Sequence, residues 1–257
     1  MSYGTLQPTL LLQALNEGKI PKYLYKYRDA KSNTESIFKS KKIWFSLSTA
    51  FNDPFDCHLS EAQHSLDDAN KFREHILEGR PDRDFLMSQP VSIERLEAAL
   101  EGSKQLKLSR LGILCLSRNY NNILMWSHYA DYHKGLVIEF DLEKDLDFFV
   151  TPIKIKYVEG YEPTNYFINQ KEAIDKIIST KSLHWSYEEE IRILKNNHVG
   201  ACAVSPAAIK RIIFGCKSDP DFKERIKILC GSAGLGHVTF SSMKMSYGKF
   251  SLECVDE

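Results

Sequence analysis

The segment Tyr23-Leu24-Tyr25-Lys26-Tyr27-Arg28 carries a tyrosine at every second position. This is the period of a β-strand, in which alternate side chains share a face, so the pattern predicts a strand that ends at Arg28. A second segment, Ser186 to Leu194, has the same period, because Ile191 and Ile193 alternate with Arg192. We expect the two segments to lie in one sheet.

Further short apolar or β-branched segments predict the rest of this sheet. They lie at 43–47, 112–117, 135–140, 153–158, 211–214, 237–240 and 249–253. Helical spacing of apolar residues predicts helices at 8–17, 124–130 and 167–183, and Asn33 is expected to cap another. The pairs Ser205-Pro206 and Asp219-Pro220 each place a capping side chain before a proline, so two late helices are expected there.

A charged segment from 65 to about 105 has a helical pattern and begins with the capping box Ser65-x-x-Asp68. Pro81 and Pro90 are expected to interrupt it. The predicted fold class is therefore α+β, with a single mixed, mostly antiparallel sheet, flanking helices and this inserted helical lobe. We expect one domain that spans residues 1–257.

Composition restricts the class of protein. The chain has 34 Lys and Arg against 34 Asp and Glu, so its net charge does not favour nucleic-acid binding by bulk charge. Its six cysteines are scattered without a CxxC pair and follow no secretory signal, which is typical of reduced thiols. The apolar runs are too short to span a bilayer. We expect a cytoplasmic protein with no membrane partner.

Three charged residues of the late strand form the first candidate site. On a strand, Glu188, Glu190 and Arg192 share one face, opposite the two isoleucines. One interpretation is that this face is solvated. The functional interpretation is a cleft in which Glu190 acts and Glu188 or Arg192 orients it or sets its pKa.

The segment Asn52-Asp53-Pro54-Phe55-Asp56 forms the second candidate site. Its composition is first of all that of a tight structural turn, because Asn and Asp bond their own backbone and proline fixes φ. The alternative is that the carboxylates and the amide bind a cation or a ribose, with Phe55 as an inward anchor.

His128 and His133 are five positions apart, which separates them by about 140° on a helix and makes joint metal ligation improbable there. With Trp126, Tyr129 and Tyr132 nearby, they are expected to line a pocket, and we assign no metal ligands. No dinucleotide-binding glycine motif, P-loop, GxSxG or HExxH pattern is present.

Several motifs occur in an order that resembles the bacterial domain-of-unknown-function family numbered 2971, from about residue 23 to 216. They are Leu24 to Arg28, Trp44-Phe45-Ser46 leading to Phe51 to Asp56, Leu124 to Ala130, Gly135 to Asp141, Trp185 to Arg192 and Ile209 to Gly215. Members of this family look like cytosolic bacterial proteins, some of them associated with mobile elements and phage defence. The resemblance gives no activity.

The order of elements is also similar, more distantly, to the ADP-ribosyltransferase fold. That resemblance implies that Arg28, with Tyr27, ends an NAD-binding strand, that Ser46 follows on a later strand, and that Glu188-x-Glu190 carries the catalytic carboxylate. Ser46-Leu47-Ser48-Thr49 departs from the usual Ser-Thr-Ser triplet, and the turn at 52–56 is no part of the usual pattern.

The leading hypothesis is thus an NAD-dependent ADP-ribosyltransferase-like enzyme, a toxin or phage-defence effector that acts on an unknown macromolecular target and has a neutralising partner protein. Catalytic roles are expected for Glu190, Glu188 and His128. Contacts to NAD, here a substrate, are expected from Arg28, Tyr27, Ser46, Asn52, Asp53, Trp126 and Tyr129. In particular, Arg28, Asn52, Asp53, Trp126, His128 and Glu190 are expected to converge on one cleft.

Two other classes remain open. One is a hydrolase or nuclease that uses a divalent cation, held by Asp53, Asp56, His128, Glu139 and Glu190. The other is a noncatalytic module that binds a nucleotide or a partner.

Overall fold

The computed structural model describes residues 8–257, which form two compact units. The first unit contains the chain through Ser46, Gly112–Ile155 and His184–Glu257. The second contains Leu47–Leu111 and Lys156–Leu183. In the described part of the chain, no helix is both long enough and apolar enough to cross a membrane.

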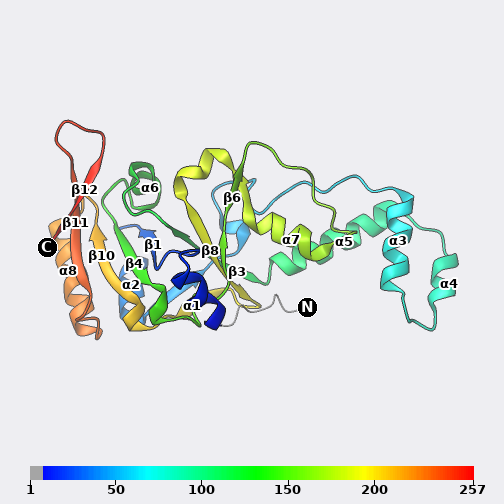
Figure 1. The fold of residues 1–257 in the computed structure, drawn as a ribbon, viewed down its shortest axis with the longest axis horizontal. Coiled ribbons are helices and arrows are strands. Elements are labelled where there is room, and N and C mark those ends of the chain that lie inside the picture. Colours follow the sequence, from blue (N-terminus) through cyan, green and yellow to red (C-terminus); the bar gives the residue numbers. More distant parts are fainter. Residues whose placement is uncertain (1–7) are drawn as a thin grey trace. The chain divides into compact units, whose positions relative to one another are not determined.

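The first unit is built on an eight-stranded sheet with the strand order β12-β11-β10-β4-β1-β3-β8-β5 (Figure 1). The strands are β1 (Tyr23–Arg28), β3 (Leu111–Ser117), β4 (Leu136–Asp141), β5 (Pro152–Lys154), β8 (Glu190–Asn196), β10 (Ile209–Phe214), β11 (Thr239–Met245) and β12 (Leu252–Asp256). β10 and β11 are parallel, whereas β1 with β4, β4 with β10, β11 with β12 and β5 with β8 are antiparallel. The predicted mixed, mostly antiparallel sheet is confirmed, and it contains both segments from which the prediction started.

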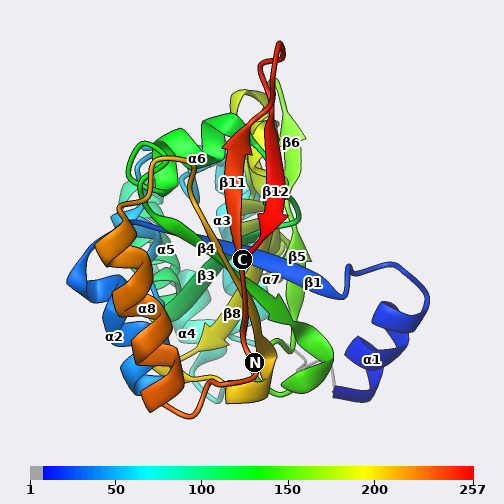
Figure 2. The ribbon, with the colours of Figure 1, turned by 90° about the vertical axis from the view of Figure 1, so that its left-hand side faces the viewer.

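Helices cover the sheet on both faces because its strands alternate between two apolar clusters. Leu24 of β1 packs in the larger cluster, together with residues of α1 (Pro8–Asn16), α2 (Ser32–Ser40) and α8 (Pro220–Ser232). Figure 2 shows α2 and α8 side by side. Tyr25 and Tyr27 point to the other face and pack against α6 (Ile123–Tyr129), with Tyr23 against the same cluster. The single tyrosine face of this strand is therefore confirmed.

β1 separates from one of its two neighbours. It pairs with β4 along its whole length, from Tyr23 opposite Asp141 to Arg28 opposite Leu136. With β3 it pairs only where Tyr25 lies opposite Ser117. In place of further backbone pairing, Lys26 Nζ donates a hydrogen bond of 2.9 Å to the carbonyl oxygen of Cys115. From Lys26 to Arg28, β1 is therefore not paired with β3, and we call this separation of the two strands the parting.

The remaining elements of the first unit are short. β2 (Lys42–Phe45) and β9 (Gly200–Ala203) form a two-stranded sheet, and Ser46 forms an isolated bridge with Ile113. The 3-10 turns are η2 (Leu142–Lys144), η3 (Leu183–Glu188), which begins in the second unit, and η4 (Pro206–Ala208).

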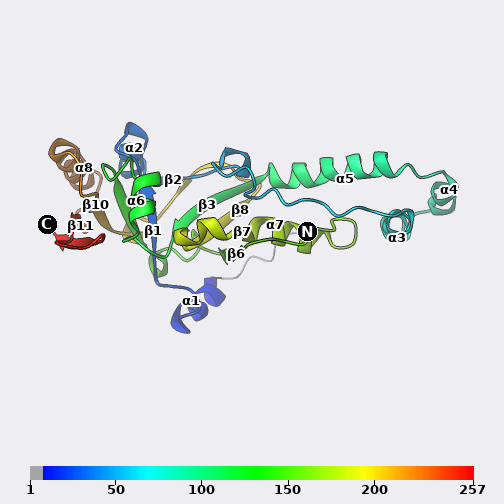
Figure 3. The same cartoon turned by 90° about the horizontal axis from the view of Figure 1, so that it is seen from above.

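The second unit contains the predicted helical lobe. Its elements are η1 (Ser48–Ala50), α3 (Leu66–Ile76), α4 (Arg83–Ser88), α5 (Ile93–Leu108), β6 (Lys156–Val158), α7 (Gln170–Ser179) and β7 (Thr180–Ser182), and Figure 3 shows the length of α5. The capping box at Ser65 and Asp68 is present, and Pro81 and Pro90 lie between helices. β6 and β7 form a two-stranded parallel sheet.

Several predicted boundaries are wrong. The strand expected at 153–158 is divided at Ile155, and its halves belong to different sheets. The helix expected at 167–183 ends at Ser179, because the β-branched Thr180 begins β7. Ser205-Pro206 opens only a 3-10 turn, and α2 begins at Ser32, so Asn33 lies inside that helix rather than capping it.

Gly135 is required where β4 begins, and a substitution there should destabilise the first unit. A Cβ atom at this position would lie 2.0 Å from the carbonyl oxygen of Arg28, and backbone cannot yield as a side chain can. We expect Gly135→Ala to lower the free energy of unfolding by about 1–3 kcal/mol, as overpacking does. Urea unfolding measures this change.

The control is Gly102→Ala, since a Cβ atom at Gly102 in α5 meets nothing within 4 Å. Alanine is the better helix former, so this variant should gain roughly 0.5–1 kcal/mol. Equal stability of Gly135→Ala and the wild type would contradict the close approach of β4 to Arg28.

Candidate functional site

A polar pocket of about 410 Å³ lies in the first unit, between the end of β1 and the helix α6. Ten residues line it: Lys26, Tyr27, Arg28, Asp29, Lys31, Ser127, His128, Tyr129, Asp131 and Tyr132. The volume is within the range of pockets that hold small molecules, roughly 300–1,000 Å³. Its first wall is the part of β1 that has parted from β3.

Three cations line this pocket, and they make it suited to an anion. Arg28 donates from Nε to Thr34 Oγ1 at 3.3 Å, and its two Nη groups bond no described residue. Lys31 has an exposed ammonium 3.8 Å from the carboxylate of Asp29. Burial lowers the pKa of Lys26, although Glu190 and Glu188 act in the opposite direction. With Asp29 and Asp131 on the walls, one positive charge remains in excess.

The second wall is α6 and the loop that follows it. Asn122 caps α6 by accepting hydrogen bonds from the backbone of Leu124 and Met125. The loop has three successive residues in the left-handed region, Asp131 (φ 48°), Tyr132 (φ 53°) and His133 (φ 71°). Each such residue costs of order 1–3 kcal/mol unless its surroundings impose the conformation, and such residues cluster at functional sites.

Glu188 is connected to this pocket through Tyr129. The Tyr129 hydroxyl, from the pocket wall, donates to Glu188 Oε1 at 2.5 Å. Ser117 Oγ fixes the backbone at the same point by donating to the carbonyl oxygen of Glu188 at 2.7 Å. The side chain of Glu188 is buried. A ligand that contacts the Tyr129 hydroxyl would therefore be connected to the Glu188 carboxylate through a single side chain.

Glu190 has a different environment, inside the sheet. Arg192 donates to it from Nε at 2.8 Å and from Nη2 at 3.2 Å, and the two side chains are 4% and 0% exposed. Burial, and next the charge of Glu190, raise the pKa of the Cys115 thiol beside them. The interpretation of Glu190 and Arg192 as a solvated face is therefore wrong.

Glu188 does not lie on β8 as predicted. It ends η3, Glu189 takes a φ of 46°, and β8 begins only at Glu190. Arg192 donates a hydrogen bond to Glu190, and Tyr129 donates one to Glu188. A left-handed residue of this kind cannot be recognised from an alternating sequence.

The structure brings part of the predicted site together. Four of the predicted residues line the pocket: Tyr27, Arg28, His128 and Tyr129. Glu188 and Glu190 do not line it, but their negative charges act to raise the pKa of Lys26, which does. His128 is exposed there, with the rings of Tyr129 and Tyr187 about 6 Å away.

The other predicted site residues do not line this pocket. The Trp126 side chain is fully buried against Tyr27, and its Nε1 donates to the carbonyl oxygen of Tyr120 at 2.8 Å, so its role is packing. Ser46 lies in its bridge to β3. Asn52 and Asp53 belong to the second unit.

The turn at 52–56 has the local bonds of a structural turn. Asp53 Oδ1 accepts from the backbone nitrogen of Phe55 at 3.0 Å, and the backbone nitrogen of Asp56 donates to the carbonyl oxygen of Asp53 at 3.1 Å. Phe55 is exposed, so the expectation of an inward anchor is wrong.

Lys26 and Lys31 were missed as site residues. Lys26 alternates with the tyrosines of the predicted strand, and a lysine at such a position is usually a solvent-exposed residue with no role in a site. The available signal was its neighbour Arg28, two positions later on the same face of β1.

Most of the carboxylates proposed for a metal-dependent hydrolase have a cation of their own. Asp56 pairs with Lys181 at 3.1 Å, Glu190 with Arg192, and Glu139 accepts from Arg211 at 2.5 Å. Over residues 8–257, no three His, Cys, Asp or Glu side chains gather to hold a metal ion.

One comparison with known proteins gives a match. Residues 125–193 match the model of a family described as "Protein of unknown function (DUF2971)". No curated protein and no solved structure matches the chain significantly. The matched segment runs from α6, through β4, to the pair of Glu190 and Arg192 on β8. The chain is therefore similar to that family over the part that supplies His128, Tyr129, Glu188 and Glu190.

Proposed function

We propose that the pocket between β1 and α6 binds NAD and that the protein transfers its ADP-ribosyl group to a macromolecule. The observation that carries the proposal is the cationic pocket at the parting of β1 and β3, beside a carboxylate pair. Lys26, Arg28 and Lys31 supply the charge that a diphosphate requires. The free Nη groups of Arg28 are suited to a bidentate contact with a phosphate.

The carboxylate would act in the bond-breaking step. The bond between ribose C1′ and the nicotinamide nitrogen breaks, and its electron pair leaves with nicotinamide. The ribose then carries an oxocarbenium-like positive charge, which a fixed negative charge stabilises. An acceptor nucleophile forms the new bond to C1′ and gives up its proton.

Glu188 is the carboxylate that bonds the pocket wall directly, because it accepts a hydrogen bond from the hydroxyl of Tyr129. Glu190 does not line the pocket, and Arg192 donates to it within the sheet. We therefore assign the charge-stabilising role to Glu188 and a positioning role, through Lys26, to Glu190.

Incubation of the purified protein with NAD and a cell lysate tests the proposal. Release of nicotinamide, together with transfer of label from adenine-labelled NAD to a macromolecule, is the expected result. Nicotinamide release without transfer indicates a glycohydrolase. If NAD stays intact but binds at the pocket, the noncatalytic nucleotide-binding module becomes the leading function.

A further inference from the structure

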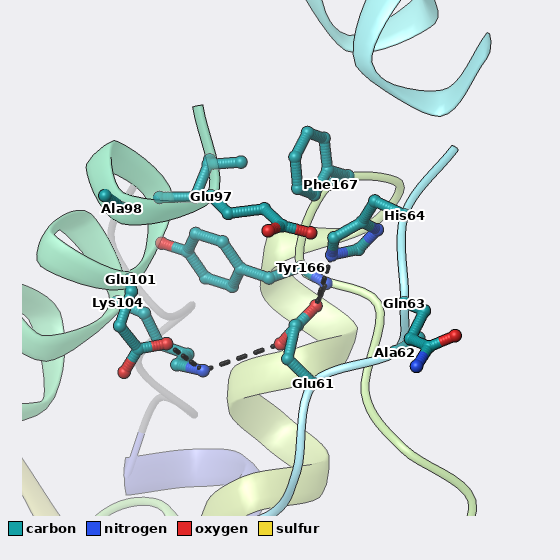
Figure 4. Close-up of a pocket in the computed structure, with 11 residues that line it drawn as sticks. Glu61, Ala62, Gln63, His64, Glu97, Ala98, Glu101, Lys104, Tyr166 and Phe167 are labelled. Atoms are coloured by element: carbon teal, nitrogen blue, oxygen red, sulfur yellow. Dashed lines mark hydrogen bonds and ion pairs between the residues drawn. The ribbon is translucent and has the colours of Figure 1, made fainter. Parts of the chain in front are cut away.

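A second pocket, of about 440 Å³, lies within the second unit (Figure 4). Three segments line it: residues 61–64 before α3, residues 97–104 of α5, and Tyr166 with Phe167 before α7. Backbone bonds hold the first and third segments together, from Ala62 to Thr164 at 2.7 Å and from Thr164 to Ser60 at 2.8 Å. The pocket is thus built by elements that are fixed to one another.

Two of its three carboxylates are already occupied. Glu61 accepts from the backbone nitrogen of Tyr166 at 2.5 Å and from Thr164 Oγ1 at 2.9 Å. Lys104 Nζ lies 2.5 Å from Glu101 and 3.5 Å from Glu61. These groups hold the walls of the pocket.

Glu97 and the Nδ1 atom of His64 have no such partner. Glu97 forms no hydrogen bond or ion pair with any described residue, and Figure 4 shows its carboxylate directed to the space beside Tyr166 and His64. The His64 side chain is only 1% exposed. Its Nε2 lies 3.4 Å from Oε1 of Glu61, within ion-pair distance but without a hydrogen bond, and its Nδ1 has no partner within residues 8–257. An unsatisfied buried polar group costs about 1–3 kcal/mol. The buried Nδ1 of His64 therefore indicates a missing ligand, and the partly exposed carboxylate of Glu97 beside it is available to bind one.

The charge and the walls define the class of that ligand. Glu61, Glu97 and Glu101 against Lys104 leave an excess of two negative charges when His64 is neutral. The rings of Tyr166 and Phe167 are nearly fully buried and form an apolar wall. Lys107 Nζ already lies 5.1 Å from the centre of the Tyr166 ring, so this ring accepts a cation on its face.

We infer that this pocket binds a guanidinium group. A guanidinium is planar, so it stacks on aromatic rings, and its paired N–H donors match a carboxylate such as Glu97. A neutral imidazole has one acceptor nitrogen, which His64 can offer to a further donor. A metal ion fits less well, because among the described residues no three His, Cys, Asp or Glu side chains gather to hold one. The source of the group is either free arginine or an arginine side chain of a protein.

Isothermal titration of the full-length protein with N-acetyl-arginine amide, L-arginine and the matched citrulline compounds tests this inference. The arginine compounds should bind, and the citrulline compounds, which lack the charge, should bind at least about tenfold more weakly. Tighter binding of the N-acetylated amide indicates a protein side chain, whereas binding of L-arginine alone indicates the free amino acid.

Glu97→Gln should weaken binding at least about tenfold with an unchanged thermal midpoint, because Glu97 holds no protein partner. Glu74→Gln is the matched control, since Glu74 is an exposed carboxylate on α3 outside the pocket. The inference fails if neither arginine compound binds at millimolar concentration, if citrulline binds equally, or if both variants weaken binding alike. NAD turnover is measured separately, so its absence leaves this result unaffected.

Discussion

Arg192→Met is expected to lower the free energy of unfolding by about 3–5 kcal/mol, since it removes the guanidinium that is bonded to the buried carboxylate of Glu190. Both side chains are almost inaccessible to water, so water cannot replace the lost partner. Methionine retains much of the volume of the aliphatic stem, which limits the contribution of a cavity. Urea unfolding monitored by circular dichroism measures the change.

Two variants show whether the effect comes from the uncompensated charge. Arg118→Met removes the neighbouring pair with Glu189, whose side chains are more than a third exposed, and should cost less than about 1 kcal/mol. The double variant Glu190→Gln with Arg192→Met removes both charges and should recover a large part of the loss. A loss below 1 kcal/mol for Arg192→Met alone would show that the pair is not structural.

The same ion pair changes how Glu190 should be studied. Glu190→Gln keeps the shape of the side chain and removes its charge. In the structure this substitution deprives Arg192, which is fully buried, of its bonded carboxylate. Loss of activity in that variant therefore cannot be separated from loss of stability.

The sheet was predictable from residues with a strict alternation. Tyr23, Tyr25 and Tyr27 identified β1 and its tyrosine face, and Ile191 with Ile193 identified β8. Alternation reports which face a side chain occupies, and both faces of this sheet are covered. It does not report strand partners, so the parting of β1 from β3 after Tyr25 could not be predicted.

The site was predictable only in part, because tertiary contacts decide the role of a polar or aromatic residue. Trp126 and Tyr129 lie on the same short helix, yet one is in the core and the other on the pocket wall. Glu189, in the left-handed region, separates Glu188 at the end of η3 from Glu190 at the start of β8. Asp56, a candidate metal ligand from its residue type, pairs with Lys181, which is remote in sequence.

Glu188→Gln should reduce NAD turnover by about 100- to 1,000-fold, the effect of losing one electrostatic contact to a developing charge in a water-excluded site. The glutamine oxygen can still accept the hydrogen bond from Tyr129, and the thermal midpoint of the variant is recorded so that rates are compared only between folded proteins. The rate of nicotinamide release at saturating NAD measures the effect, and it should fall without a comparable change in KM.

Two variants locate the effect at Glu188. Glu189→Gln removes the adjacent, partly exposed carboxylate that pairs with Arg118, and it should change the rate by less than about fivefold. Arg28→Ala should instead raise KM, because its role is to hold the phosphates in the ground state and the transition state alike. Equal rates for Glu188→Gln and the wild type would remove Glu188 from the mechanism. If turnover were then lost only when Glu190 is replaced in a variant that keeps its stability, the charge that stabilises the ribose would be that of Glu190.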